Sequence, residues 1–125
     1  MHRIVALALL ALATLAIPSS AADKDFLAGR VAGKPVNCID PQMNNGPTII
    51  DADTILYNAN GRRLYRTGPV GKCPSLRPMT TLIVEIRSGQ LCRNDLFRVL
   101  EPGTTIASAY CRFRDFTPYE KPKKP

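Results

Sequence analysis

The four cysteines, Cys38, Cys73, Cys92 and Cys111, constrain the fold of this chain more than any other feature. The closest two are nineteen residues apart, and no C-x-x-C motif occurs. This spacing argues against a redox-active dithiol and against a four-thiolate metal site. An even number of widely spaced cysteines in a short exported chain is typical of structural disulfides. We therefore expect two disulfide bonds.

Spacing alone leaves the disulfide pairing open, because four cysteines allow three pairings. A Cys73–Cys92 bond would close a loop between neighbouring strands, and a Cys38–Cys111 bond would tie the start of the domain to its last strand. We expect these two bonds, with the other two pairings as alternatives.

The N-terminus has the pattern of an export signal. A short basic start is followed by an almost wholly apolar run over residues 4–17 and then by small residues up to Ala22. The run is short for a bilayer-spanning helix, which needs about 20 residues. We expect a signal peptide over residues 1–22, cleaved after Ala21 or Ala22, and a periplasmic or secreted protein without a transmembrane segment after cleavage. An uncleaved anchor is the alternative.

The mature chain is expected to be one domain over residues 23–119, followed by a disordered basic tail over residues 120–125. It is basic, with sixteen Lys or Arg against ten Asp or Glu, and the only histidine, His2, lies in the signal peptide. A Ser-His-Asp or Cys-His enzyme and a His-containing zinc site are therefore excluded. We expect no cofactor and no metal.

Apolar alternation and turn residues predict a mainly β fold. Residues 25–32 could form one short helix, although Gly29 weakens it. Asn60-Gly61 and Pro102-Gly103 are typical turn sequences. We expect a small antiparallel sheet, curled into a barrel or packed as a sandwich, with five or six strands. The predicted strands lie in residues 48–50, 54–57, 62–67, 80–87, 96–100 and 104–114.

Several short motifs also resemble a known family. These are Cys38-Ile39-Asp40, the Ile-Asp-Ala-Asp-Thr-Ile-Leu-Tyr run at residues 50–57, Leu64-Tyr65-Arg66, Cys73-Pro74-Ser75-Leu76, Gln90-Leu91-Cys92 and Cys111. Together they resemble a domain-of-unknown-function family of small exported proteins of Gram-negative bacteria, over most of residues 38–117. The resemblance implies export and disulfides. The family has no assigned activity, so it implies no site.

The densest basic and aromatic group, Arg62, Arg63 and Arg66 with Tyr65 and Tyr57 nearby, is the candidate binding site. Arginine binds phosphate and carboxylate groups through two parallel hydrogen bonds, and tyrosine can stack on a ligand. Export makes nucleic acid a poor target. The expected partner is an anionic envelope component, such as a lipid headgroup, lipopolysaccharide or acidic cell-wall polymer, or another envelope protein. A solvated strand face is the simpler interpretation.

Carboxylates offer an enzymatic alternative. Asp51 or Asp53 could act with Glu85 or Asp95 as a histidine-free hydrolase, which requires a defined separation across a cleft. Capping of a turn is the more common role for such aspartates. A secreted inhibitor of another enzyme is a further alternative, although a basic domain would be repelled by a basic lysozyme. We favour a non-enzymatic binding or structural module.

Overall fold

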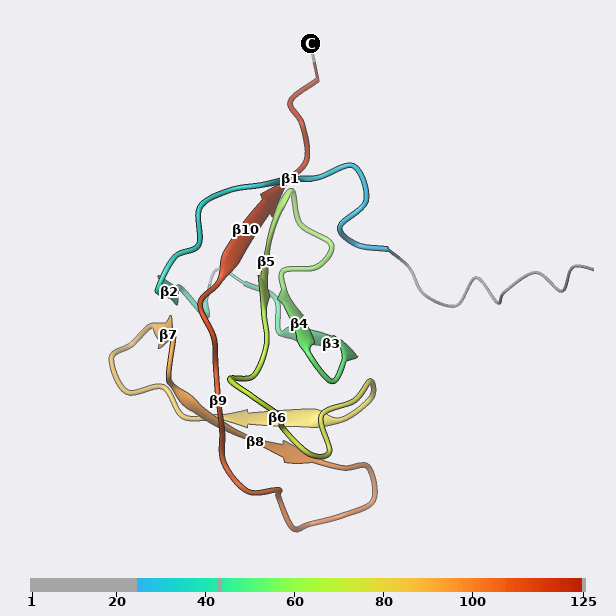
Figure 1. The fold of residues 1–125 in the computed structure, drawn as a ribbon, viewed down its shortest axis with the longest axis vertical. Helices are drawn as coiled ribbons and strands as arrows, with labels where there is room; N and C mark the ends of the chain where they lie inside the picture. The colour runs from blue at the N-terminus through green and yellow to red at the C-terminus, as the bar shows by residue number, and fades with distance from the viewer. Residues whose placement is uncertain (1–24, 43, 125) are drawn as a thin grey trace, which may run out of the picture.

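The computed structural model describes residues 25–42 and 44–124, and every regular element in them is a short strand (Figure 1). The strands form three antiparallel sheets, in the orders β1-β10-β5-β4-β3, β6-β8-β9 and β2-β7. Their bounds are β1 Val31–Ala32, β2 Cys38–Ile39, β3 Pro47–Asp51, β4 Thr54–Tyr57, β5 Arg63–Thr67, β6 Thr81–Val84, β7 Leu91–Cys92, β8 Leu96–Leu100, β9 Cys111–Arg112 and β10 Thr117–Glu120. The mainly β prediction is confirmed, with more and shorter strands than the five or six expected.

The C-terminal segment joins the sheets. It passes through β9 in the three-stranded sheet and then through β10 in the five-stranded sheet, so one continuous stretch spans the length of the domain (Figure 1). Between these strands, Phe113 forms a bridge with Pro69, and Phe116 forms one with Val36. Residues 111–120 therefore connect elements from both halves of the chain.

Aromatic side chains fill the main core. Phe97, Phe113 and Phe116 are fully buried, and the ring centroids of Phe97 and Phe113 lie 4.4 Å apart. Tyr57 packs edge-on against Phe113 and Phe116, at 6.3 and 6.2 Å between centroids. Phe113 and Phe116 come from the connecting segment, so burial of their rings stabilises the junction between the sheets.

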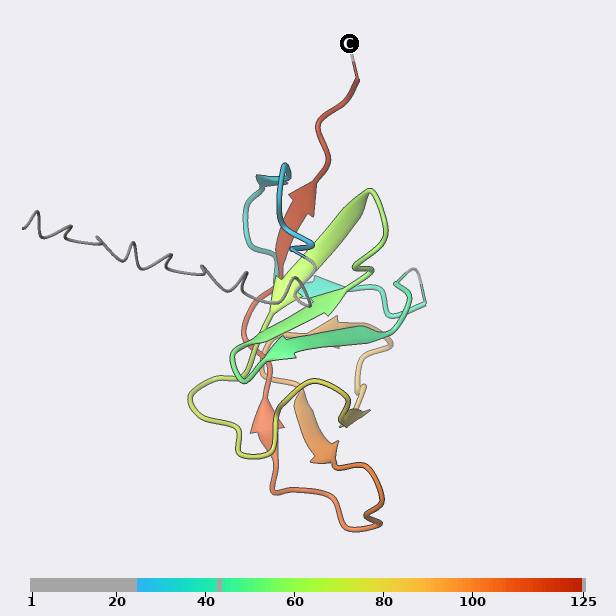
Figure 2. The same ribbon diagram turned by 90° about the vertical axis from the view of Figure 1, so that its right-hand side faces the viewer.

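A smaller apolar cluster lies on the other face of the five-stranded sheet, because successive strand residues point to opposite faces. Tyr65 packs against the main core, whereas its neighbour Leu64 joins the smaller cluster with Leu56 and Ala59. Phe26, from the turn before β1, packs against this cluster. Figure 2 shows this turn, in blue, beside strand β10, in red.

The short helix predicted for residues 25–32 is wrong, because no helix occurs among the described residues. Asp25 begins a turn instead, with its carboxylate accepting the N–H of Leu27 and its carbonyl accepting the N–H of Ala28. Gly29 has a φ of 72°, a left-handed conformation that ends helices. The next residues form β1, paired with β10.

The strand predicted over residues 104–114 is also wrong in its first part. Only Cys111–Arg112 form strand β9, and Ser108 uses its hydroxyl to accept the N–H of Val99. The turn before this loop is confirmed: Thr104 donates to the carbonyl of Glu101, and Gly103 has a φ of 77°.

The ordered domain extends beyond the predicted boundary at residue 119. Glu120 is the last residue of β10 and lies opposite Arg63, and Lys121 donates its backbone N–H to the carbonyl of Arg62. Pro118 inside this strand is the reason that sequence patterns miss it, because proline is depleted in strands.

Two disulfides are present, as predicted, but their pairing is not the expected one. Cys38 bonds to Cys92, and Cys73 bonds to Cys111. The expected Cys73–Cys92 and Cys38–Cys111 bonds are therefore wrong. Cys38 and Cys92 lie opposite each other in the β2–β7 pair, which sequence alternation does not reveal because each strand has two residues.

The two disulfides are typical of an oxidising, non-cytoplasmic compartment. The predicted signal peptide, residues 1–22, lies outside the described residues. Within the part of the chain that the structure describes, no helix has the length and apolar character needed to span a membrane.

Candidate functional site

The structure divides the predicted arginine group between the two faces of the five-stranded sheet. Arg63 and Tyr65 share the face of the main core, while Arg66 lies on the opposite face with Leu64. Arg63 is neutralised by an ion pair with Glu120, its neighbour across β10. A hydrogen bond with Tyr65 and this ion pair raise the pKa of Arg63 above its ordinary value.

Arg62 lies exposed in the loop between β4 and β5, and the structure gives only its backbone a role. Its carbonyl oxygen accepts hydrogen bonds from the Arg30 side chain at 2.8 Å and from the Lys121 N–H at 3.1 Å. Only one of the four predicted site residues, Arg66, borders the site described next. The other three are Arg62, Arg63 and Tyr65.

Two shallow hollows share a wall made by Arg114 and Asp115. The smaller hollow has a volume of about 80 Å³ and the larger about 310 Å³. We call this pair the double hollow. Its other lining residues are Arg66, Thr67 and Thr117 in the smaller hollow, and Val70, Arg93 and Asn94 in the larger.

Arg114 is held in place by groups around the end of β5. Its Nη2 donates to the carbonyl oxygen of Asp53 at 3.0 Å, and its backbone N–H donates to the carbonyl of Gly68 at 2.8 Å. The Thr67 hydroxyl donates to the Arg114 carbonyl at 3.1 Å. Of the five N–H donors of the Arg114 guanidinium, one therefore forms a hydrogen bond within the fold.

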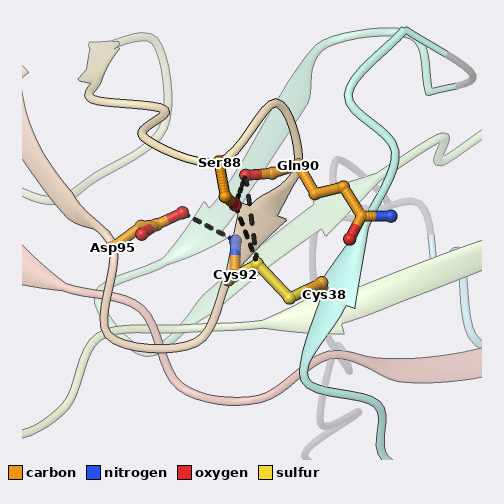
Figure 3. The surroundings of a disulfide bond; sticks show 5 residues. All are labelled: Cys38, Ser88, Gln90, Cys92 and Asp95. Atoms are coloured by element: carbon orange, nitrogen blue, oxygen red, sulfur yellow. Dashed lines mark hydrogen bonds between the residues drawn. A yellow bond between two sulfur atoms is a disulfide. The ribbon is translucent and has the colours of Figure 1, made fainter.

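A tight turn at residues 92–95 places Arg93 at the rim of the larger hollow. Asp95 donates its N–H to the Cys92 carbonyl at 3.0 Å and accepts the Cys92 N–H on its carboxylate at 2.7 Å. Asn94 has a φ of 71°, as the third residue of a type II turn requires. The disulfide to Cys38 fixes the start of this turn (Figure 3).

Backbone bonds fix the same turn against its surroundings. Arg93 donates its N–H to the Asn37 carbonyl at 2.7 Å, and Asn94 donates to the Phe113 carbonyl at 2.9 Å. Phe113 in turn donates to Asp95 at 3.1 Å. The backbone under Arg93 is therefore held on both sides, while the Arg93 side chain remains exposed.

The double hollow carries an excess of positive charge. Arg66, Arg93 and Arg114 face a single carboxylate, that of Asp115. Among residues 25–42 and 44–124, the ion pairs join other residues, and none involves these three arginines. By contrast, a separate hollow of about 410 Å³, lined by residues 103–108, has Glu101 as its only charged lining residue. We therefore take the double hollow as the candidate anion site.

The carboxylates of the predicted hydrolase site lie on different elements of the fold, and Asp51, Glu85 and Asp95 each accept a separate hydrogen bond. Asp51 caps the turn between β3 and β4 by accepting the N–H of Asp53 at 2.8 Å. Glu85 accepts the Tyr110 hydroxyl at 3.0 Å, and Asp95 serves the turn after β7. The described residues contain no group of three or more His, Cys, Asp or Glu that could hold a metal ion.

Arg93 and Arg114 are not among the site residues predicted from the sequence. Each follows a cysteine closely, and Arg112, Phe113 and Arg114 alternate charged, apolar and charged side chains. This alternation places Arg112 and Arg114 on the side opposite the buried Phe113, so the sequence could have indicated that Arg114 lies on an exposed face.

No protein family model, no curated protein and no solved structure matches this chain. The resemblance to a family of small exported proteins therefore stays a prediction.

Proposed function

We propose that this protein is a non-enzymatic binding module of the bacterial cell envelope that holds an anionic polymer in the double hollow. The observation that carries the proposal is the set of three arginines, Arg66, Arg93 and Arg114, around two adjoining hollows, without an ion pair among the described residues. Arginine is the side chain best suited to carboxylate and phosphate groups, because its planar fork donates two parallel hydrogen bonds.

The proposed compartment, the periplasm or the exterior of the cell, is supported by the two disulfides and by the export pattern of residues 1–22. Anionic polymers and lipids of the envelope are accessible there, and nucleic acid is not an expected partner. The mature chain carries a clear excess of Lys and Arg, which favours encounter with an anionic target.

A binding role fits the site better than catalysis. The double hollow has one carboxylate, Asp115, and no histidine, because the only histidine of the chain is His2. General acid and base catalysis by carboxylates needs two of them on either side of the reacting bond.

A charge-removal experiment tests the proposal. The Arg66→Ser/Arg93→Ser double variant removes two charges from the double hollow without breaking a side-chain hydrogen bond that holds Arg114. Binding of the oxidised protein to polygalacturonate and to polyphosphate is measured by isothermal titration calorimetry. We expect the wild-type protein to bind at least one polymer, and the variant to bind it at least tenfold more weakly.

The Arg62→Ser/Arg87→Ser double variant is the matched control, because it removes the same charge from exposed positions outside the double hollow. It should bind within about twofold of the wild-type protein. Equal loss in both variants would show that net charge alone drives binding. That result, or no binding to either polymer, would overturn the proposal.

A further inference from the structure

We infer that the polymer held in the double hollow is an acidic polysaccharide, a chain of sugars that carry both carboxylates and free hydroxyls. This inference rests on the proposed function and names the ligand class of the same site. It follows from the mixed character of the lining residues, which differs from that of a uniformly basic surface.

The position of Asp115 is the first argument. Asp115 is half-buried and lines both hollows together with Arg114, and it forms no ion pair within residues 25–42 and 44–124. An ionised carboxylate only accepts hydrogen bonds, so it repels an anion and attracts a hydroxyl donor. A ligand that satisfies both Arg114 and Asp115 therefore carries anionic groups and hydroxyls close together. Sugar acids do, whereas a polyphosphate chain presents acceptors alone at neutral pH.

The larger hollow also has an apolar wall. Val70 is 48% exposed and lines this hollow together with Arg93 and Asn94. A pyranose ring has an apolar C–H face that can pack against Val70, while the Asn94 amide can both donate and accept hydrogen bonds with ring hydroxyls. Such a combination of an apolar wall with a few polar groups is typical of small-ligand sites.

The size and arrangement of the hollows fit a chain of small units. The larger hollow, of about 310 Å³, is at the lower end of the roughly 300–1,000 Å³ range of ligand pockets. The smaller hollow continues on the far side of Arg114 and Asp115, with Arg66 at its border. One sugar in the larger hollow and its neighbour over the smaller one would place successive carboxylates near Arg93, Arg114 and Arg66.

The concave shape and Asp115 both disfavour a membrane surface. Lipid headgroups in a bilayer form a continuous anionic plane, which attracts exposed basic segments without a shaped site. A carboxylate set between the arginines weakens that attraction. A single extended chain, however, can enter both hollows in succession.

The decisive experiment compares two polycarboxylates with the full exported protein. Polygalacturonate has carboxylates and hydroxyls on sugar rings, and polyacrylate has carboxylates at higher density without hydroxyls or rings. We expect polygalacturonate to bind at least tenfold tighter per carboxylate than polyacrylate. Asp115→Asn should lower this ratio at least threefold, because it removes the charged acceptor for hydroxyls. Asp40→Asn is the control, since an Asn at this position can still accept the Gln42 N–H, and the ratio should not change.

Four results would overturn the inference. In the first, polyacrylate binds as tightly as polygalacturonate; in the second, Asp115→Asn leaves the ratio unchanged. If binding still requires Arg66 and Arg93, either result would show that the double hollow is a general anion site. Tighter binding to vesicles containing phosphatidylglycerol than to polygalacturonate would assign the site to membranes. Binding that is independent of Arg66 and Arg93 would remove the proposed function itself, so the two failures are distinguishable.

Discussion

The guanidinium of Arg30 donates a hydrogen bond to the carbonyl oxygen of Arg62 at 2.8 Å. Its other N–H groups reach the carbonyls of Phe26 at 2.8 Å, Ala59 at 3.3 Å and Tyr119 at 3.5 Å. One side chain thus joins the turn before β1, the β4–β5 loop and β10. Carbonyls in a loop need donors when strand pairing does not supply them, and Arg30 supplies these donors.

Replacing Arg30 should therefore destabilise the domain. Hydrogen bonds from a charged donor contribute about 1.5–3 kcal/mol each when buried, and Arg30 is half-buried, so we expect Arg30→Gln to lower the free energy of unfolding by about 2 kcal/mol. Urea denaturation followed by circular dichroism measures this change. Arg62→Gln is the control, because only the backbone of Arg62 is used, and it should stay within about 0.5 kcal/mol of the wild-type protein. Equal effects of the two changes would contradict the role of Arg30.

The two disulfides should differ in their accessibility to thiols. Cys73 and Cys111 are buried, at 5% and 9% exposure, whereas Cys38 and Cys92 are half-buried. Exchange requires the attacking thiolate to reach a sulfur atom. We expect limiting dithiothreitol to reduce the Cys38–Cys92 bond first.

Differential alkylation followed by tryptic peptide mapping checks this order and the pairing together. Without reduction, residues 31–62 should be linked to residues 88–93, and residues 73–87 to residues 99–112. The first pair of peptides should acquire the alkyl label at lower reductant concentration. A link between residues 73–87 and 88–93 would instead support the pairing expected from the sequence.

Tyr57 should make the domain sensitive to high pH. Burial raises the pKa of this phenol well above the ordinary value of 10.0. The unfolded chain then loses its proton near pH 10, while the folded protein keeps it, so stability falls as the pH rises above 10. The slope for one such group is about 1.4 kcal/mol per pH unit.

Unfolding experiments between pH 9 and pH 12 test this effect, with Tyr57→Phe as the comparison. The variant lacks the ionisable group and should lose stability less steeply above pH 10 than the wild-type protein. Identical slopes in the two proteins would show that the Tyr57 phenol is accessible to base in the folded state.

Sequence patterns predicted the parts of the fold that depend on local alternation and turn chemistry. Strands β3, β4, β5, β6 and β8 all lie in or next to the predicted segments, and the Pro102-Gly103 turn has the expected conformation. The two-residue strands β2 and β7 are too short for any periodicity. Their pairing decides the Cys38–Cys92 bond, so the disulfide pairing could not be derived.

The candidate site was missed for a related reason. The cluster at residues 62–66 is dense in the sequence, but alternation along β5 sends Arg63 and Arg66 to opposite faces. The double hollow instead combines residues from β5, the turn after β7 and the segment after β9. Arg66, Arg93 and Arg114 are far apart in the sequence, and only the tertiary fold brings them to adjoining hollows.

Gly68 links the stability of the domain to the proposed site. It has no positive φ, so its requirement is for space: a Cβ added here would lie 2.1 Å from the Asp53 carbonyl oxygen and 2.7 Å from Nη2 of Arg114. Both contacts are too short, so Gly68→Ala must move the β3–β4 turn and the guanidinium of Arg114, a residue that lines both hollows. Overpacking of this kind costs about 1–3 kcal/mol.

We therefore expect Gly68→Ala to lower the free energy of unfolding by about 1–3 kcal/mol and to weaken polygalacturonate binding under conditions in which the variant is fully folded. Gly46→Ala is the control, because a Cβ there has open space and the backbone φ is not positive. That change should leave binding unaltered and stability the same or slightly higher, since alanine restricts the unfolded chain. A folded Gly68→Ala variant that binds as tightly as the wild-type protein would show that ligand binding does not depend on the position of Arg114. The proposed site would then depend on Arg66 and Arg93 alone.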